Sequence, residues 1–355
     1  MRAFTFEAHI PRTILGSGTI SRIPDEIRRL NVERVLLITE STDRQLALSK
    51  TIGDSLGSHC AGVCADAVMH TPLEVTEKAL ETALQVHADS LVSIGGGSTI
   101  GLGKALAVRM NVPHVAVPTT YAGSEATPIL GETVNGEKKT RSDPRILPTT
   151  IIYDIDLTLS LPLSLTFTSG INAIAHCVEA LHSEQINPLI ESLALQGISS
   201  LYSSLQILKD APNNMDARGQ ATTGAWAAGI CLGHVGMALH HKLCHTLGGT
   251  FGLPHSETHT VMLPYAMAYN AEAASCAMRS ISNAIGYDGN AAKAIWELER
   301  SLGTVRSLQD LGMKKDDLVK AATLAGQSRY PNPAPLEHGK LLNLLENAFY
   351  GRPPI

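Results

Sequence analysis

The sequence predicts an α/β domain in the first part of the chain and an all-α domain in the second. In residues 1–155, short β-branched and aliphatic runs alternate with helical stretches, which is typical of a parallel sheet covered by helices. After residue 155, long stretches rich in Ala, Leu and Ser follow, such as residues 169–183 and 191–208. We therefore expect domains at 1–155 and 156–355. Because no linker rich in Pro, Gly or Ser separates them, we expect them to pack closely around a ligand-binding cleft.

Three strands of the first domain are predicted from continuous apolar runs, at residues 34–39, 90–94 and 114–117. Thr71-Pro72 precedes a stretch with one apolar helical face, so we expect a helix within residues 73–87. A second helix is expected from the glycines after residue 94 through Val108.

The N-terminal edge of this domain is predicted to be an antiparallel hairpin. Phe4 and Phe6 alternate with polar residues, residues 13–18 form a second β-like run, and Pro11 lies in the connection.

The composition excludes several classes of protein for these 355 residues. With 44% hydrophobic and 17% charged residues, the chain does not have the profile of a disordered protein. A net charge of −5 without a long basic run argues against a nucleic-acid partner. No apolar segment reaches the roughly 18 residues that span a bilayer, and the N-terminus lacks the apolar stretch of a signal peptide. We expect no membrane segment and a cytoplasmic location.

The cysteines are too sparse for a disulfide scaffold and form no CxxC pair. We expect buried free thiols at all six positions, which are Cys60, Cys64, Cys177, Cys231, Cys244 and Cys276.

A glycine-rich loop follows the predicted strand at 90–94. Gly95, Gly96 and Gly97 lack a Cβ, so their backbone N–H groups can approach a phosphate, and the N-terminus of the following helix adds a positive dipole. Together with Ser98 they predict a pyrophosphate site for NADH or NADPH. The alternative is a tight strand-to-helix turn with Ser98 as the N-cap, because the sequence matches neither GxGxxG nor the Walker pattern.

A second loop of small polar residues follows the strand at 114–117, and it should lie beside the glycine loop at the carboxyl edge of the sheet. Its candidate cofactor-binding residues are Thr119, Thr120, Tyr121 and Ser124. For Tyr121, contact with the substrate, packing under the nicotinamide and plain structural packing stay open. Glu40 follows the strand at 34–39, where a carboxylate can bind a ribose hydroxyl and repel a 2′-phosphate. We therefore expect NADH to be preferred, although Glu40 is equally ordinary as a strand-end charge.

Histidine is concentrated in the second domain, where eight of the 14 histidines lie between His176 and His259. His241 and His245 are spaced i, i+4, as are Asn172 and His176, so each pair shares a helix face. With His255 in a following loop, these imidazoles resemble a divalent metal site.

Position 172 nevertheless holds a neutral amide instead of a carboxylate, and HxxxH without a central Glu is not the zinc-protease motif. Clustering by chance is the alternative. It fits His182, His234, His240 and His259 better than a catalytic role does.

Taken together, these segments resemble the iron-containing alcohol dehydrogenase superfamily, and more closely its maleylacetate reductase branch. The segments that carry the resemblance are residues 94–104, 118–125, 148–154, 241–249 and 254–255. The resemblance implies a dehydroquinate synthase-like fold, with a dinucleotide-binding α/β domain, a helical domain and the nicotinamide in the cleft between them.

Metal-dependent members of the superfamily have Asp at the position of Asn172, with ligands at His176, His241 and His255. Their glycine loop carries a second Asp where this chain has Gly101. Both departures point away from metal-dependent alcohol oxidation, so we expect no required metal.

The resemblance implies NAD(P)H-dependent reduction of the carbon–carbon double bond of 2-maleylacetate to 3-oxoadipate during the breakdown of aromatic compounds, by a homodimer. His245 and His241 are the expected proton donor or enolate stabiliser. His176 and His255 complete a polar wall together with Asn172. Lys242, and less clearly Arg329, are expected partners for the substrate carboxylates.

Two alternatives stay open. One is a metal-dependent alcohol or glycerol-type dehydrogenase of the same fold, and the other is a nucleotide-binding protein without chemistry.

Overall fold

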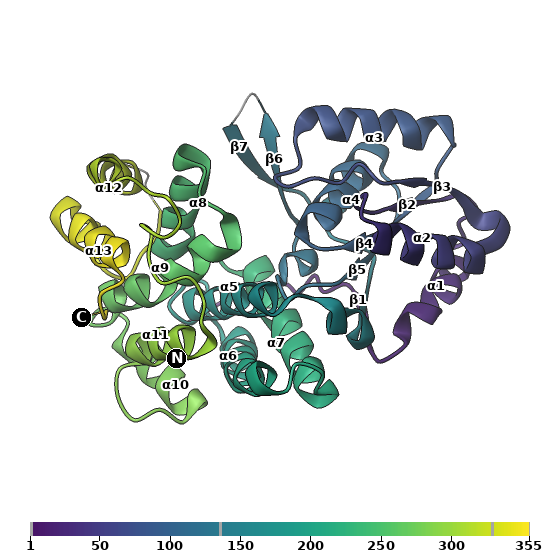
Figure 1. Ribbon diagram of the computed structural model, residues 1–355. Helices are drawn as coiled ribbons and strands as arrows, with labels where there is room; N and C mark the ends of the chain where they lie inside the picture. The colour runs from purple at the N-terminus through teal and green to yellow at the C-terminus, as the bar shows by residue number, and fades with distance from the viewer. Residues whose placement is uncertain (1–2, 135–136, 328–329, 355) are drawn as a thin grey trace. The chain divides into compact units, whose positions relative to one another are not determined.

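The computed structural model describes residues 3–134, 137–327 and 330–354 (Figure 1). It divides into an α/β unit, His9–Leu161, and a helical unit formed by Pro162–Ile355 with the residues before His9. The α/β unit therefore extends a few residues past the expected boundary at 155. A short 3₁₀ helix, Ile155–Ser160, continues it, and the Asp154 side chain at the end of the last strand caps this helix.

The α/β unit contains a six-stranded parallel sheet with the order β1-β8-β5-β4-β2-β3, which confirms the predicted class. The strands are β1 Arg12–Gly16, β2 Val35–Ile38, β3 Cys60–Cys64, β4 Ser90–Gly95, β5 His114–Pro118 and β8 Thr150–Asp154. The main helices are α1 Ile23–Leu30, α2 Asp43–Leu56, α3 Leu73–Gln85 and α4 Gly97–Met110. An antiparallel hairpin that was not predicted, β6 Ile129–Val134 with β7 Glu137–Ser142, forms a separate small sheet.

The sheet is buried on both faces because successive strand residues point to opposite sides. Leu37 and Val92 share one apolar cluster with α1 and α2. Their neighbours Leu36 and Leu91 belong to a second cluster with α3 and α4. Figure 1 shows α3 above the strands and α1 below them. The continuous apolar runs that predicted these strands therefore reflect two-sided burial.

The predicted N-terminal hairpin is wrong. Among the described residues before Arg12 there is no strand, and β1 pairs in parallel with β8. Phe6 instead stacks against the His234 ring of the helical unit, with the ring centroids 5.4 Å apart. Phe4 is exposed, so Phe6 alone of the two aromatic residues packs on a helix.

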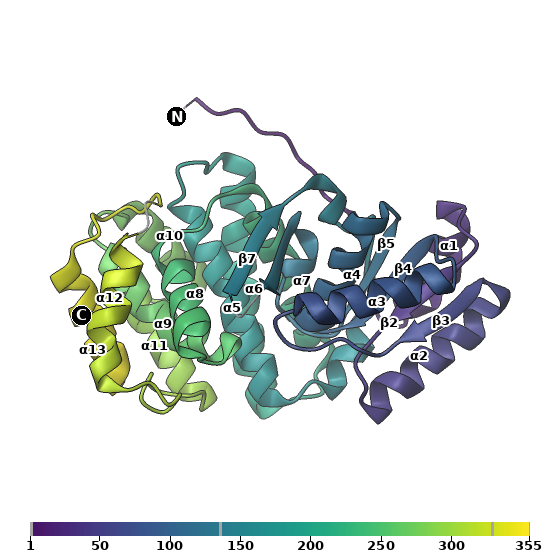
Figure 2. The ribbon, with the colours of Figure 1, turned by 90° about the horizontal axis from the view of Figure 1, so that it is seen from above.

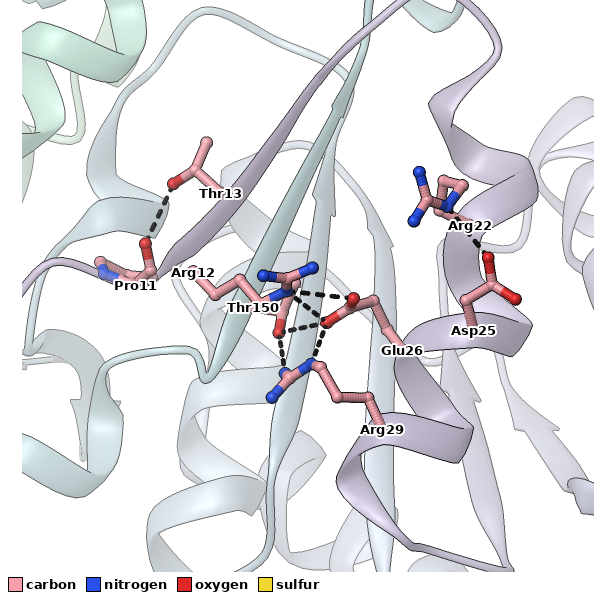
Figure 3. A network of polar contacts seen from close by, with 8 residues as sticks. All are labelled: Pro11, Arg12, Thr13, Arg22, Asp25, Glu26, Arg29 and Thr150. Atoms are coloured by element: carbon pink, nitrogen blue, oxygen red, sulfur yellow. Dashed lines mark hydrogen bonds and ion pairs between the residues drawn. The ribbon is translucent and has the colours of Figure 1, made fainter.

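A buried carboxylate ties this edge of the sheet together (Figure 3). The Glu26 carboxylate on α1 accepts hydrogen bonds from Arg12 Nε at 3.1 Å, Arg29 Nε at 2.8 Å and Thr150 Oγ1 at 3.1 Å. Burial alone would raise the pKa of Glu26, but these hydrogen bonds from Arg29, Arg12 and Thr150 together lower it. The network joins β8 to β1 and α1, which lie more than 100 residues earlier in the chain.

His114 at the start of β5 gives the α/β unit a pH-dependent stability. Burial, with a smaller contribution from the Lys104 charge, lowers the pKa of His114 from 6.5 to about 3. As the pH falls below 6.5 the unfolded chain binds a proton here while the folded chain does not, so the free energy of unfolding decreases.

From pH 7 to pH 5 we expect this residue to cost about 2 kcal/mol of stability. Urea titrations at both pH values should show a loss smaller by that amount in His114→Gln than in the parent. Equal losses in the two proteins would contradict the assignment.

The helical unit consists of nine α-helices within its described residues. They are α5 Leu163–Leu181, α6 Pro188–Asp210, α7 Met215–His234, α8 Leu239–Phe251, α9 His255–Asn270, α10 Ser275–Ile285, α11 Ala291–Leu302, α12 Leu318–Gln327 and α13 His338–Tyr350. Both views show α12 and α13 side by side (Figures 1 and 2). Throughout the described chain, no helix combines the length and apolar character needed to cross a bilayer.

Four of the six cysteines are buried thiols as predicted, but Cys60 is half-buried and Cys276 is exposed. The expectation of uniform burial is wrong at Cys276, which lies near the start of α10 with its sulfur beside Arg279.

Candidate active site

Three of the predicted cofactor-binding segments meet at the carboxyl edge of the sheet. These segments follow β5, β4 and β2, which lie side by side in the sheet. The Thr119 N–H donates to the Gly95 carbonyl at 3.0 Å, and Thr99 Oγ1 donates to the Glu40 carboxylate at 3.3 Å. Glu40 therefore lies beside the glycine loop, where a ribose next to a bound pyrophosphate would need it.

The space available for an added side chain differs among the three glycines of the loop. A Cβ on Gly95 would lie 2.8 Å from Thr99 Cβ, and one on Gly96 would lie 3.3 Å from Thr120 Cγ2. At Gly97, nothing in the described chain would come within 4 Å of an added Cβ. Gly97 is also the first residue of α4, so the chain leaves space for an anion in front of a helix N-terminus. The alternative with Ser98 as N-cap is wrong, because Gly96 occupies that position.

Gly97→Ala should therefore weaken cofactor binding without harming the fold. The added methyl has room in the protein and favours the helix, but it occupies the phosphate space. We expect the Kd for NADH in a fluorescence titration to rise at least about tenfold, with an unchanged or slightly higher Tm.

Gly339→Ala is the matched control, since Gly339 also lies in the first turn of a helix with no described atom near its added Cβ. Unchanged NADH affinity in Gly97→Ala would remove the phosphate assignment.

The second predicted loop is held by a buried lysine that the sequence analysis did not single out. Lys104 Nζ on α4 donates to the carbonyl oxygens of Ser124 at 2.6 Å, Thr127 at 2.8 Å and Ile129 at 3.2 Å. Burial lowers the pKa of Lys104 to about 7, while the nearby Glu125 opposes that shift. The available signal was a single Lys within an otherwise apolar helical stretch.

This anchoring changes the expected roles in the loop. The Ser124 backbone carbonyl is bound by Lys104, and the Tyr121 side chain is only 1% exposed. For Tyr121 the structure favours packing among the three roles considered. Thr119 and Thr120 are half-buried beside the glycine loop.

The helical unit brings together six histidines from three helices. His176 lies on α5, His240, His241 and His245 on α8, and His255 and His259 on α9. The His241 ring is central, with its centroid 4.9 Å from that of His176, 5.1 Å from His240, 5.0 Å from His259 and 6.3 Å from His245. His255 joins through His259, with their centroids 4.3 Å apart. We call these six residues the histidine cluster.

Three buried members of the histidine cluster are held neutral, namely His176, His240 and His259. Burial lowers the pKa of His240 to about 4 and lowers the pKa values of His176 and His259 well below 6.5. Several buried polar atoms here have no hydrogen-bond partner among the described residues, namely Asn172 Oδ1, His176 Nδ1 and both ring nitrogens of His259. Atoms of this kind require water or a polar ligand.

Three residues that contact this site were not singled out from the sequence. His240 and His259 were grouped with ordinary surface or core histidines, and both are buried side chains whose rings pack within the histidine cluster. Glu179 was not considered, yet its buried carboxylate accepts a hydrogen bond from His241 Nδ1 at 2.7 Å. Asn172, His176 and Glu179 are spaced four and three residues apart, so one face of α5 carries all three. A lone Glu at that spacing in an apolar helix was the available signal.

The remaining predicted residues differ in accessibility. His245 is exposed and His255 is half-buried, so the pair His241 and His245 spans from the interior of the unit to its surface along one helix face. Lys242 is half-buried. Arg329 lies outside the described residues.

The donor set differs from that of a divalent metal centre with a carboxylate ligand. His240, His241 and His259 have ligand atoms within 4.8 Å of one another, which is a different group from the one that the family resemblance implies. His241 Nδ1 is bound to Glu179, and His240 Nε2 donates to the His259 carbonyl at 2.9 Å. Asn172 adds a neutral oxygen, and the Glu179 carboxylate is already bound by three donors. Within the described residues, the site therefore offers no available anionic ligand.

The fold and these two groups of residues define a two-domain, nucleotide-dependent oxidoreductase. Residues 11–155 match the family model "Iron-containing alcohol dehydrogenase", and residues 166–349 match "Fe-containing alcohol dehydrogenase family, C-terminal". The chain belongs to the iron-containing alcohol dehydrogenase family, which confirms the resemblance and the fold.

Several relatives are similar over their whole length. Maleylacetate reductase from Pseudomonas knackmussii is 46% identical over 351 residues, covering 99% of both chains. Maleylacetate reductase 1 from Cupriavidus pinatubonensis is 45% identical over 354 residues, covering 100% of this chain and 99% of that one. The crystal structure of maleylacetate reductase from Agrobacterium tumefaciens superposes with a TM-score of 0.96 at 43% identity, with both chains fully covered. A 1,3-propanediol oxidoreductase structure, at 24% identity and a TM-score of 0.91, shares the fold.

Proposed function

We propose that this protein reduces the carbon–carbon double bond of 2-maleylacetate with NADH or NADPH, giving 3-oxoadipate in the catabolism of aromatic compounds. The observation that carries this proposal is the 43–46% identity to maleylacetate reductases over essentially the full length of each chain. The glycine loop and the histidine cluster provide the residue types that such a reaction needs.

The reaction is a conjugate reduction. The reduced nicotinamide supplies a hydride to the alkene carbon β to the ketone. Negative charge then gathers on the ketone oxygen as an enolate, and the α carbon takes a proton. The chain must stabilise that oxygen and deliver that proton, and preorganised hydrogen-bond donors do the first of these efficiently.

His241 is the proposed proton donor, with His245 as the residue that connects it to solvent. His176, His240 and His259 stay neutral at neutral pH because burial lowers their pKa values, so they are poor sources of a proton. His241 differs from them because a carboxylate contacts its ring. Asn172 and His255 complete the polar wall, and Lys242 is the proposed partner of a substrate carboxylate.

We further propose that no metal is required. The support is the donor set, which among the described residues offers an amide at position 172 and no available carboxylate. The test is NADH oxidation with maleylacetate before and after exhaustive chelation, together with elemental analysis. Full activity after chelation is expected. Loss of activity that Fe²⁺ or Zn²⁺ restores would favour the metal-dependent dehydrogenase instead.

NADH is the proposed preferred cofactor, because Glu40 lies beside the glycine loop. Glu40→Ala should lower the ratio of kcat/KM for NADH to that for NADPH about tenfold, since a carboxylate repels the 2′-phosphate. Glu74→Ala removes an exposed carboxylate from the first turn of α3 in the same unit and serves as a control for net charge. An unchanged ratio in Glu40→Ala would contradict the ribose role.

By resemblance to the family we also propose a homodimer located in the cytoplasm. Sedimentation velocity on the purified chain tests the assembly, and a single monomeric species would contradict it.

A further inference from the structure

Glu179 is a buried carboxylate to which the reaction described above gives no role. Its side chain lies on α5 and is 1% exposed. It accepts three hydrogen bonds, from the His241 ring at 2.7 Å, the His240 backbone N–H at 2.7 Å and the Ala238 backbone N–H at 2.9 Å. All three donors belong to the first turn of α8 or to the residue before it.

The backbone part of this arrangement is a helix cap supplied from another helix. The N-cap residue of α8, Ala238, has no side chain able to accept a hydrogen bond, so the N–H groups there need another partner. Glu179 binds two of them and Asn332 Oδ1 accepts from the third, the Leu239 N–H, at 3.4 Å. A carboxylate at this end also interacts favourably with the helix dipole.

The side-chain part fixes the tautomer of His241. An ionised carboxylate only accepts, so the contact at 2.7 Å places a hydrogen on His241 Nδ1 and leaves Nε2 as the nitrogen that gains or loses a proton. The neighbouring His240 is consistent with this assignment. Its Nε2 donates to the His259 carbonyl, so its Nδ1, 3.4 Å from His241 Nδ1, is an acceptor and does not compete for Glu179.

Glu179 is a charged group in direct contact with the His241 ring. The rings packed around His241 from the other helices are His176 on α5 and His259 on α9, and burial keeps both neutral. His240, on the same helix, is also neutral. A positive charge on His241 would be compensated by the buried Glu179 carboxylate, and such compensation is stronger there than at the exposed surface.

We propose that Glu179 is the positioning residue of the reduction, holding His241 as the Nδ1–H tautomer with Nε2 directed to the substrate. When the Nε2 proton passes to the α carbon, the enolate electron pair forms the new C–H bond. The imidazolium then returns to the neutral Nδ1–H form, with Nδ1 still bound to the Glu179 carboxylate. A proton from solvent restores the imidazolium. The proposal rests on the proposed function.

Glu179→Gln is the decisive variant. It keeps the shape of the side chain, but its amide NH₂ can donate to His241 Nδ1 and favour the opposite tautomer. We expect kcat to fall about 10- to 100-fold, as for other residues that orient a functional imidazole, with little change in the Kd for NADH. Glu179→Asp, which retains the carboxylate, should recover part of kcat.

Glu299→Gln is the matched control. Glu299 lies on α11 in the same unit and is also buried, and burial raises its pKa well above the usual value. Burial disfavours the charged form of this carboxyl group, so a neutral amide of nearly the same shape is a conservative replacement. Turnover should stay within about twofold of the parent, because Glu299 lies outside the histidine cluster.

The tautomer is measured directly by long-range ¹H–¹⁵N correlation on histidine-labelled protein without substrate, with His241 assigned from the spectrum of His241→Gln. The parent should show Nδ1–H and Glu179→Gln should lose it. An Nε2–H tautomer in the parent would overturn the proposal, whether or not the variant folds. A lower Tm in Glu179→Gln with kcat within threefold of the parent would also overturn it and leave Glu179 as a cap alone.

The activity assay and the NMR measurement test the proposed function and the role of Glu179 separately. If the parent does not reduce maleylacetate, the proposed function fails, while the NMR spectrum still decides whether Glu179 fixes His241.

Discussion

His241→Ala is expected to lower kcat for maleylacetate reduction by about a hundredfold or more, the scale usual for loss of a general acid or an oxyanion donor. The His241 ring lies against the Glu179 carboxylate, which contacts its Nδ1 at 2.7 Å. The Kd for NADH should barely change, because the phosphate-binding glycines belong to the other unit. Steady-state kinetics and NADH titration of the same preparation measure both quantities.

Two further histidine variants test whether the loss of turnover is specific to histidines of the active site. His245→Ala should also lower kcat strongly if the exposed ring relays the proton. His338→Ala changes an exposed histidine at the start of α13 and should keep parental turnover. Parental turnover in both His241→Ala and His245→Ala, whatever their melting temperatures, would remove the pair from the active site.

Gly224→Val is expected to be the most destabilising substitution considered for the helical unit. Gly224 lies where α7 crosses α6, and a Cβ there would meet Leu201 Cγ at 2.7 Å, the Gly197 carbonyl oxygen at 3.1 Å and the Leu201 backbone nitrogen at 3.3 Å. Two of these obstacles are backbone atoms of a neighbouring helix, so they cannot move aside as a flexible side chain does. We expect a loss of about 3 kcal/mol in the free energy of unfolding, at the upper end of ordinary overpacking.

Urea titration measures this loss, and Gly339→Ala is again the reference because its added Cβ meets nothing in the described chain. That control should stay within about 1 kcal/mol of the parent. A Gly224→Val protein as stable as the parent would show that α6 and α7 can separate locally without cost.

The elements that the sequence predicted correctly are those whose local pattern is compatible with a single kind of structure. Continuous apolar runs such as residues 34–39 and 90–94 are buried on both faces of a parallel sheet. The Phe4 and Phe6 alternation suggested a strand, but Phe4 is exposed and only Phe6 packs on a helix, so the alternation is no sign of a buried strand face. The His234 ring on which Phe6 stacks lies more than 200 residues later in the chain.

The same distinction applies to the site. The glycine loop, Glu40 and the i, i+4 spacing of His241 and His245 are local features, and the sequence was sufficient to single them out. Glu179 contacts the site only because α5 packs against the first turn of α8, some 60 residues along the chain, and local sequence does not predict that packing. His240 and His259 meet across α8 and α9 in the same way.

The assignment of the first residues to the helical unit has a consequence for synthesis on the ribosome. The α/β unit can fold once residue 161 has emerged, with β1 closing on β8. The segment before His9 has to wait for His234, the ring on which Phe6 stacks. At about 5–20 residues per second, translation of the intervening chain takes on the order of ten seconds. Until then Phe6 lacks the ring on which it stacks in the folded helical unit, so the aromatic segment before His9 stays accessible to a chaperone or a protease.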